Sequence, residues 1–323
     1  MKTIINEMLV TSINNSLPEG EKLVSFLMDL LNLSRESAYR RIRNEIPFTF
    51  EEVIAISLKL GLSLDEIAGQ EQKNRAFFDL PVPKSADPLD VYSEIVDVAA
   101  EIYKKMQKSK ESEIFFTANQ LPFPYYMLYE NLSKFYYYKW IHKTQEVPLN
   151  FYLSEFSPPS QVSTVHKRYR YAATKVNQVT AILCPSFILS TVKEIIYFYR
   201  RRLITKEELF LLQEDLYKVI NKLENDTRKG IDENGVKTDL YCSTLNIASN
   251  SIWFRHDNET GTQFWTYTDP ITVYNTEVSK RHKMWIDSLL KYSTLISQSN
   301  EIQRSEFFNK QNEYVKNIEN LTL

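Results

Sequence analysis

Apolar residues recur every three or four positions over residues 21–31, the spacing that places them on one face of a helix. They are Leu23, Phe26, Leu27, Leu30 and Leu31. Asn32 and Leu33 end the pattern, and the hydroxyl of Ser34 can accept a hydrogen bond from the first turn of a new helix. We therefore predict two helices, one over about 21–31 and one from residue 35 onward, joined by a short turn.

The second of these helices has one apolar pair, Ala38 and Ile42, and is otherwise polar and rich in arginine. A DNA-recognition helix places its N-terminal side chains on base edges in the major groove, and nearby basic groups contact phosphates. We predict base or near-base contacts from Arg35, Glu36, Ser37 and Arg40, and phosphate contacts from Tyr39, Arg41 and Arg43. With the capping residue Ser34, these form the candidate DNA-binding set.

Two capping boxes mark the helices that follow. In this motif a Ser or Thr and a Glu three residues later each accept a hydrogen bond from the other's backbone. Thr49 with Glu52 and Ser63 with Glu66 fit the motif, so helices are expected to start near residues 50 and 64. Gly61 stands where a left-handed residue ends the first of them. Together with a leading helix over 3–14, the region is predicted to form a bundle of four or five helices.

The run LSRESAYRRI followed by FTFEEVIAISLKLGLSLDEI resembles the helix-turn-helix of the lambda-repressor-like, XRE-type regulators. The match covers about a fifth of the chain. Asn32 stands where a turn glycine is common in that family, and the adjacent Arg40 and Arg41 are a second departure. The resemblance implies that the helix beginning at Ser34 reads double-stranded DNA.

The charge of residues 1–69 does not decide whether this region binds DNA. Residues 1–69 contain seven Lys and Arg against ten Asp and Glu, and only the stretch 35–43 is locally basic. We expect weak non-specific DNA binding, with a salt dependence set by a few phosphate contacts. Helix pairs of this kind also serve as protein-interaction modules or scaffolding, with arginines on a solvated face, and both alternatives stay open.

The composition is that of an ordinary globular protein. The 323 residues carry a formal net charge of −2, with 25% charged and 43% hydrophobic residues. We find no apolar run long enough to cross a membrane and no signal-peptide pattern, and Cys184 and Cys242 are the only cysteines. We therefore predict a cytoplasmic protein without a membrane partner. Six glycines supply no GxGxxG or Walker A loop, so no nucleotide cofactor is expected.

A break in the pattern separates two regions. Residues 70–87, followed by Pro88, combine charges with prolines and read as a linker. Beyond it, helices are predicted over about 88–106, 125–143, 161–178, from 185, 206–224, 278–292 and 305–321. Strands are predicted at 113–118, near 153, near 182 and in four segments between 238 and 277. The predicted fold class is therefore multidomain: an all-α helix-turn-helix domain over 1–69, the linker, and a mixed α/β (α+β) domain over 88–323.

The segment 125–143 has the most unusual composition in the chain. Its aromatic residues are too many for one helix face. They are Tyr125, Tyr126, Tyr129, Phe135, Tyr136, Tyr137, Tyr138 and Trp140. Either they are packing residues with hydrogen-bonded hydroxyls, or some of them line a ligand pocket or a dimer face.

Little in the sequence points to catalysis. The four histidines lack metal-ligand spacing, no GxSxG elbow is present, and both cysteines are expected to be structural. Basic clusters at 166–170, 200–202 and 280–283 are expected to be solvated, unless two of them converge on a pocket and bind an anion. We predict no catalytic residue, no metal and no cofactor.

The function predicted from these patterns is sequence-specific, DNA-binding transcriptional regulation by a homodimer that is not an enzyme. The large C-terminal domain is expected to supply dimerisation or to sense a small-molecule effector. The alternatives are an enzyme that carries an autoregulatory helix-turn-helix and a protein-interaction adaptor.

Overall fold

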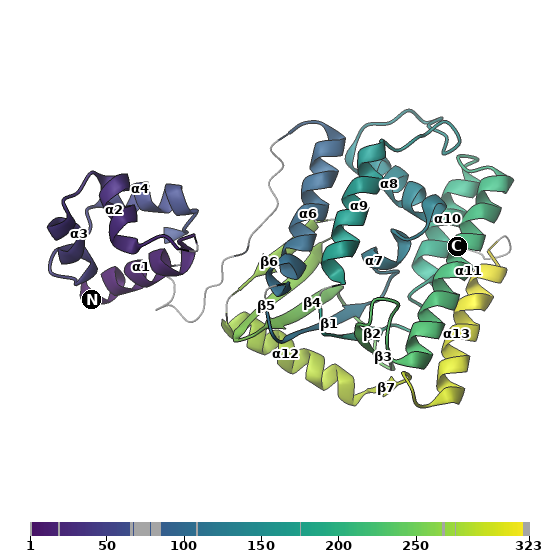
Figure 1. Cartoon of the computed structure of the whole chain (residues 1–323). Coiled ribbons are helices and arrows are strands. Elements are labelled where there is room, and N and C mark those ends of the chain that lie inside the picture. The colour runs from purple at the N-terminus through teal and green to yellow at the C-terminus, as the bar shows by residue number, and fades with distance from the viewer. Residues whose placement is uncertain are drawn as a thin grey trace. The chain divides into compact units, whose positions relative to one another are not determined.

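The computed structural model describes residues 2–18, 20–64, 67, 78, 85–107, 109–174, 176–266, 269–274 and 276–318. These residues form 12 helices and a seven-stranded mixed sheet, so the protein is of the mixed α/β class. The chain divides into two compact units, residues 1–77 and 78–323 (Figure 1). Most of the predicted linker, residues 70–87, lies outside the described residues.

The described residues of the first unit form four helices, which lie where the apolar spacing and the caps predict them. They are α1 (Lys2–Ser16), α2 (Leu23–Leu31), α3 (Arg35–Ile42) and α4 (Phe50–Leu60). One residue from each helix is wholly buried in a shared core: Ile13, Leu27, Ala38 and Ile56. The Thr49 and Glu52 capping box is confirmed, and Gly61 ends α4 with a φ of 67°. The predicted box at Ser63 includes Glu66, which lies outside the described residues.

The second unit is built on one sheet with the strand order β6-β5-β4-β1-β2-β3-β7. The strands are β1 (Ser112–Ala118), β2 (Gln178–Leu183), β3 (Lys237–Ser243), β4 (Ser251–His256), β5 (Glu259–Thr266), β6 (Asp269–Val273) and β7 (Ser293–Leu295). The neighbours β1, β2 and β3 are parallel, and the other neighbouring pairs are antiparallel. The six longer strands coincide with predicted strands, whereas the three residues of β7 are too few to show an alternating pattern.

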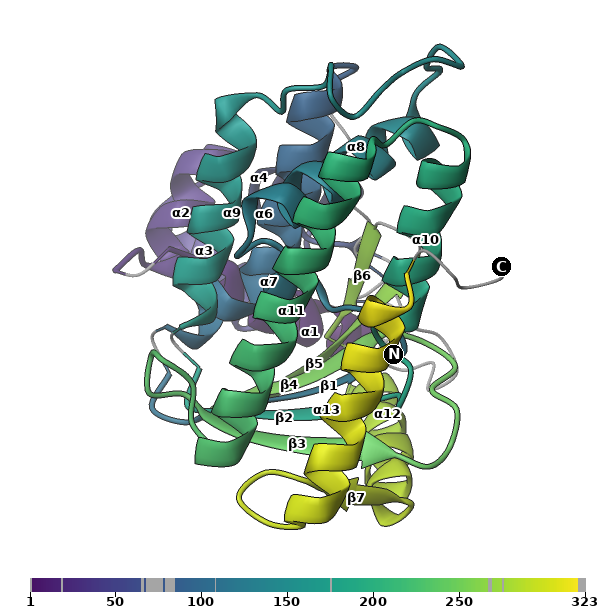
Figure 2. The same cartoon turned by 90° about the vertical axis from the view of Figure 1, so that its right-hand side faces the viewer.

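The helices of this unit are divided unequally between the two faces of the sheet. The chain steps from β1 to β2 to β3 in one direction, and right-handed crossovers then place both connections on the same face. Figures 1 and 2 show α6 to α11 and α13 on that face and α12 on the other. The helices are α6 (Pro88–Met106), α7 (Phe123–Tyr126), α8 (Glu130–Thr144), α9 (Ser160–Ala173), α10 (Leu189–Arg200), α11 (Lys206–Lys229), α12 (Thr276–Lys291) and α13 (Glu301–Lys316).

Alternating side chains of the strands supply the two cores. Ile114 of β1 and Ala181 of β2 belong to the large core beneath α6 to α11. Ile182 and Trp253 point the other way and pack with Ile286 of α12. The sheet is therefore buried on both faces, as parallel strands require.

The predicted helix over 125–143 is wrong in its continuity, because it is divided into α7 and α8. Two backbone N–H groups in the first turn of α8, those of Asn131 and Leu132, donate to one carboxylate oxygen of Asp215 at 3.0 and 3.3 Å. Asp215 is on α11 and is 2% exposed. It caps α8 from another helix, so a new helix can begin at Glu130 and α7 can turn away from it.

Other predicted boundaries also need correction. The strand predicted near residue 153 is wrong: this segment is irregular, and Phe151 and Phe156 pack on the ring of Tyr138 instead of entering the sheet. The helix predicted from residue 185 begins later, at Leu189. The helix expected to end near 224 continues to Lys229, because buried Thr227 extends its packed face, and Gly230 ends it with a φ of 68°.

Gly261 gives a test of how tightly this sheet is packed. It pairs with Phe254 across β4 and β5, and a Cβ added at Gly261 would lie 2.3 Å from the Phe254 ring. Phe254 is wholly buried, so the ring has no free space to enter. We expect Gly261→Ala to lower the free energy of unfolding by about 2 kcal/mol, measured by urea denaturation. The double variant Gly261→Ala, Phe254→Leu should lose less than the sum of its parts, and strictly additive losses would contradict this packing.

Candidate nucleic-acid interface and aromatic cavity

A short turn positions the start of α3. Asn32 ends α2 with a φ of 52°, a left-handed conformation that asparagine tolerates better than most residues. The Ser34 hydroxyl accepts a hydrogen bond from the backbone N–H of Ser37 at 3.2 Å, so the predicted cap is confirmed. The wholly buried Ala38 then anchors α3 to the core and sets which side of the helix faces outward.

Arg41 differs from the other arginines of α3 because its side chain is largely buried in an ion pair with Glu52. Its Nε and Nη2 donate to the two carboxylate oxygens of Glu52 at 2.9 and 2.7 Å, and the two side chains are only 12% and 15% exposed. Glu52 also accepts from the backbone N–H of Thr49 at 2.9 Å. Burial alone would raise the pKa of Glu52, but the hydrogen bonds from Arg41 and Thr49 outweigh it and hold this pKa below its usual value of 4.5. The pair thus joins α3 to the capping box of α4.

The loop after α3 is fixed from α1. The Asn6 side chain, only 8% exposed, donates to the backbone oxygen of Arg41 and to the side chain of Asn44, and it accepts from the N–H of Phe48. Asn44 has a φ of 61°, and its amide donates to Glu7 at 3.1 Å. These bonds hold the C-terminal end of α3 against the bundle.

The outward face of α3 carries the remaining arginines. Arg35, Tyr39 and Arg43 follow one another at intervals of four residues, and both guanidinium groups lie within 6 Å of the Tyr39 ring, at 5.8 and 5.6 Å. Arg40 and Arg43 have half or more of their side chains exposed and contact Glu45 at 3.5 and 3.9 Å. Such exposed ion pairs are weak, so these arginines can exchange Glu45 for another anion.

Seven of the eight predicted DNA-contact residues are therefore at least partly accessible on α3 or at its cap. Five are exposed: Ser34, Arg35, Glu36, Arg40 and Arg43. Ser37 and Tyr39 are half-buried. Arg41 is the exception, because its guanidinium is turned toward Glu52.

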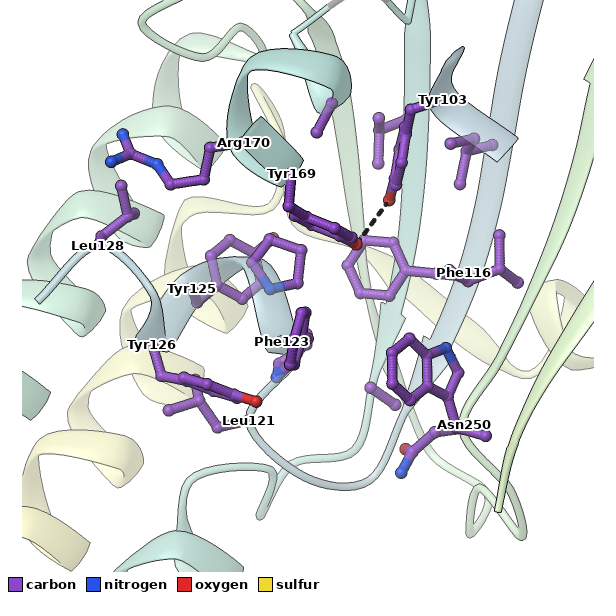
Figure 3. Close-up of a pocket in the computed structure, with 18 of the residues that line it drawn as sticks. Tyr103, Phe116, Leu121, Phe123, Tyr125, Tyr126, Leu128, Tyr169, Arg170 and Asn250 are labelled. Atoms are coloured by element: carbon purple, nitrogen blue, oxygen red, sulfur yellow. Dashed lines mark hydrogen bonds between the residues drawn. The ribbon is translucent and has the colours of Figure 1, made fainter. Parts of the chain in front are cut away.

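The second unit contains a cavity of about 680 Å³ between the sheet and helices α6, α7, α8, α9 and α11. Aromatic rings supply much of its lining, and Figure 3 shows Phe116, Phe123 and Tyr126 around it. The Phe123 ring makes edge-on contacts with Tyr126 and Tyr169, at 5.2 and 5.3 Å between centroids. The aromatic segment thus lines a pocket, one of the two outcomes left open by its composition.

The other outcome, hydrogen-bonded packing, holds for Tyr136 of this segment, and three tyrosines of α6 and α9 that line the same cavity are bonded in the same way. Tyr92 bonds to Nε2 of His166 at 2.7 Å, Tyr169 donates to Tyr103 at 3.3 Å, and Tyr136 bonds to Thr191 at 2.6 Å. Burial raises the pKa of all four tyrosines, so their hydroxyls stay protonated. The cavity wall is therefore a rigid, largely satisfied network.

Charged groups at the rim of the cavity are mostly paired. Lys222 contacts Asp226 at 2.9 Å and Glu233 at 3.3 Å, and Lys139 contacts Glu194 at 2.6 Å. Of the predicted basic clusters, 166–170 contributes Lys167 and Arg170 to the lining, whereas 200–202 and 280–283 contribute no residue to it. The clusters do not converge on this pocket.

Two of the four histidines are buried and hydrogen-bonded within the fold. His166 lies between Tyr92 and Ser133, and His282 between Ser251 and Thr262, and burial lowers the pKa of each to about 4. Among the described residues, no group of three or more His, Cys, Asp or Glu could hold a metal ion. Over the same part of the chain, no helix is both long and apolar enough to span a membrane.

Sequence reasoning did not find every residue that shapes these sites. Asn6 and Asp215 act over long sequence distances, and no local pattern marks them. Asn250, which lines the cavity beside β1, lies in a turn between predicted strands and carries no motif. Arg170 belongs to the basic cluster at 166–170, so the sequence did indicate this residue.

Comparisons with known proteins add no assignment. No protein-family model matches the chain, and a search of curated proteins gives no match.

The Arg41 and Glu52 pair generates a pH-dependent prediction for the first unit. Because the pKa of Glu52 is lowered by folding, its stabilising contribution is present above about pH 4.5 and is lost as the pH falls through the folded pKa. We expect Glu52→Gln to lower the free energy of opening of α3 and α4 by about 2 kcal/mol at pH 7, measured by amide hydrogen exchange on the full chain.

The difference from the unsubstituted protein should shrink between pH 7 and pH 3. Glu21→Gln is the matched control, since Glu21 is an exposed acid of the same unit that lies outside α3 and α4. A loss that is the same at both pH values would contradict the role given to Glu52.

Proposed function

We propose that the protein is a sequence-specific, DNA-binding transcriptional regulator whose first unit is an all-α helix-turn-helix domain. In this proposal α2 and α3 are the two helices of the motif, and α3 enters the major groove. The observation that carries it is the outward face of α3, where Arg35, Tyr39, Arg40 and Arg43 are accessible while Arg41 is held inside. A helix that buries little but is capped and anchored at both ends is suited to rigid recognition.

The proposed contact set follows from these positions. Arg35 and Glu36, in the first turn of α3, are assigned to base edges, because an arginine fork matches guanine and a carboxylate accepts from cytosine. Ser34 and Ser37 lie near the same end. Arg40 lies in the last turn of α3 and is assigned to a near-base contact, and Tyr39 and Arg43 are assigned to phosphates. Arg41 is left out of the set, because a contact to DNA would cost its two hydrogen bonds to Glu52.

The second unit is proposed to be the regulatory part of the molecule. Its mixed α/β fold contains a cavity of a size that accommodates small ligands. We also propose that the protein acts in the cytoplasm and that its target is double-stranded DNA.

A selection of random duplex DNA on the full-length protein tests the DNA-binding function. We expect an enriched motif, and binding to it should weaken by 1–3 kcal/mol, roughly 5- to 150-fold, in Arg35→Ala, with relaxed preference at one base pair. Arg43→Ala should weaken all sequences alike and reduce the slope of log affinity against log salt by about 1.

Lys22→Ala is the control for these variants, because Lys22 is an exposed cation of the same unit outside α3. If no motif is enriched, or if Lys22→Ala weakens binding as much as Arg35→Ala, α3 is not the recognition helix.

From the sequence, the C-terminal domain is expected to supply dimerisation, but the exposed apolar surface of α4 leads us to propose that the homodimer forms through the first unit instead. Phe50, Ile54 and Leu58 make an apolar stripe at intervals of four residues, and they are 71%, 36% and 81% exposed. In an antiparallel pair of α4 helices around a two-fold axis at Ile54, Phe50 would meet Leu58 of the second copy. The start of α4, which carries Glu51, would then lie beside the C-terminal end of the second copy's α4, which is basic because of Lys59. The surface is therefore complementary to itself in charge.

We expect Leu58→Glu to convert the protein to a monomer in sedimentation equilibrium and to weaken binding to a palindromic site at least tenfold, since the two α3 helices would no longer bind as one unit. Met284→Glu is the control, because Met284 is an equally exposed apolar residue of the second unit. A dimer that persists in Leu58→Glu would place the interface elsewhere.

A further inference from the structure

The cavity of the second unit has the size of a small-molecule site. Its volume of about 680 Å³ lies within the roughly 300–1,000 Å³ of known ligand sites. The helical turn α7 supplies one wall, and Figure 3 shows Phe123 and Tyr126 of α7 facing Phe116 of the sheet. The inference goes beyond DNA binding and concerns the second unit alone.

Aromatic rings make up much of the cavity walls, and several of them are in contact with one another. Tyr126 is stacked on Tyr136 with 3.6 Å between centroids, and Phe123 lies 5.5 Å from Trp265. Walls of this kind favour a planar ring, which can stack on a face or meet an edge, over a flexible aliphatic chain.

Two hydrogen-bond donors in the cavity have no acceptor among the described residues. The Tyr126 residue is 7% exposed, its hydroxyl has no hydrogen-bond partner among the described residues, and Figure 3 shows this hydroxyl directed into the cavity. Asn250 accepts from the backbone N–H of Asn119 through Oδ1 at 2.9 Å, which leaves its Nδ2 without a partner in the described part of the chain. A protonated hydroxyl and an amide nitrogen both donate, so together they suit an acceptor such as a carboxylate.

The charges around the cavity favour an anion. Arg170 of α9 is half-buried at the rim, and its guanidinium has no ion-pair partner among the described residues, whereas nearby Arg168 is paired with Asp97 at 2.7 Å. Asp232, an acid that also lines the cavity, accepts hydrogen bonds from the backbone N–H groups of Asn234 and Val236. An unpaired cation beside a low-dielectric cavity attracts anionic ligands.

We propose that this cavity binds a small planar aromatic carboxylate. Its ring lies against Phe123, Tyr126 and Trp265, and its carboxylate accepts hydrogen bonds from the Tyr126 hydroxyl and the Asn250 amide. Arg170 draws the anion to the rim.

Isothermal titration calorimetry of the full-length protein with 1-naphthoate tests this proposal without DNA. We expect saturable binding at one site per chain. 1-Naphthamide has the ring without the charge, and cyclohexanecarboxylate and decanoate have the charge without the aromatic ring, so all three should bind at least tenfold more weakly. A flat titration with 1-naphthoate up to millimolar concentration overturns the proposal, and so does decanoate binding as tightly as 1-naphthoate.

Substitutions then locate the site. Tyr126→Phe keeps the ring and removes the donor, and Asn250→Asp keeps the oxygen that accepts from Asn119 and replaces the amide donor with a negative charge. We expect 1-naphthoate to bind about 5- to 10-fold more weakly to the first variant and at least tenfold more weakly to the second, with unchanged thermal unfolding of Tyr126→Phe. Arg170→Gln should slow association and weaken binding, most clearly at low salt.

Two variants serve as matched controls. Arg168→Gln makes the same charge change as Arg170→Gln on the same helix, and Tyr197→Phe removes a hydroxyl from an exposed tyrosine of α10. Controls that weaken 1-naphthoate binding as much as the cavity variants would overturn the assignment to this cavity. Because no DNA is present, a failure of the DNA-binding proposal would leave this result unaffected.

Discussion

The second unit depends on the direction in which the chain crosses its central sheet. Two successive right-handed crossovers from β1 to β2 to β3 require the connecting helices to share one face. With α6 and α13 also on that face, and α12 on the other, the helical layer is thick on one side only (Figures 1 and 2). Large aromatic side chains fill such a layer, and the space that they leave between α7 and the sheet is the cavity.

A single buried carboxylate, that of Asp215, determines where α8 begins in that layer. Asp215 caps the start of α8 through two backbone N–H groups, and Lys218 balances its charge at 2.9 Å. A carboxylate only 2% exposed would be costly without these bonds. With them, the aromatic segment divides into α7 and α8, and the four residues of α7 can turn their rings toward the cavity.

Interactions between residues close in the sequence could be predicted from it, and interactions between distant residues could not. The capping box at Thr49 is local, so spacing alone predicts the start of α4, and the box is present. Asp215 lies 84 residues from Asn131, and no periodicity can show that it caps α8. The segment near residue 153 has the apolar, aromatic composition of a strand, but composition records burial and does not record hydrogen-bonding partners. The cavity was one of two predicted uses of the aromatic segment, and both occur.

The arginines of α3 show the same limit within one helix. Arg40 and Arg41 are adjacent and chemically identical, so sequence reasoning gave both to DNA. Their Cβ atoms diverge by about 100° around the helix axis, which leaves Arg40 half exposed and turns Arg41 toward Glu52. A buried, bidentate pair is costly to break, whereas the exposed contact of Arg40 with Glu45 is weak. The pair therefore fixes the orientation of α3, and that orientation is what keeps Arg35, Arg40 and Arg43 facing outward.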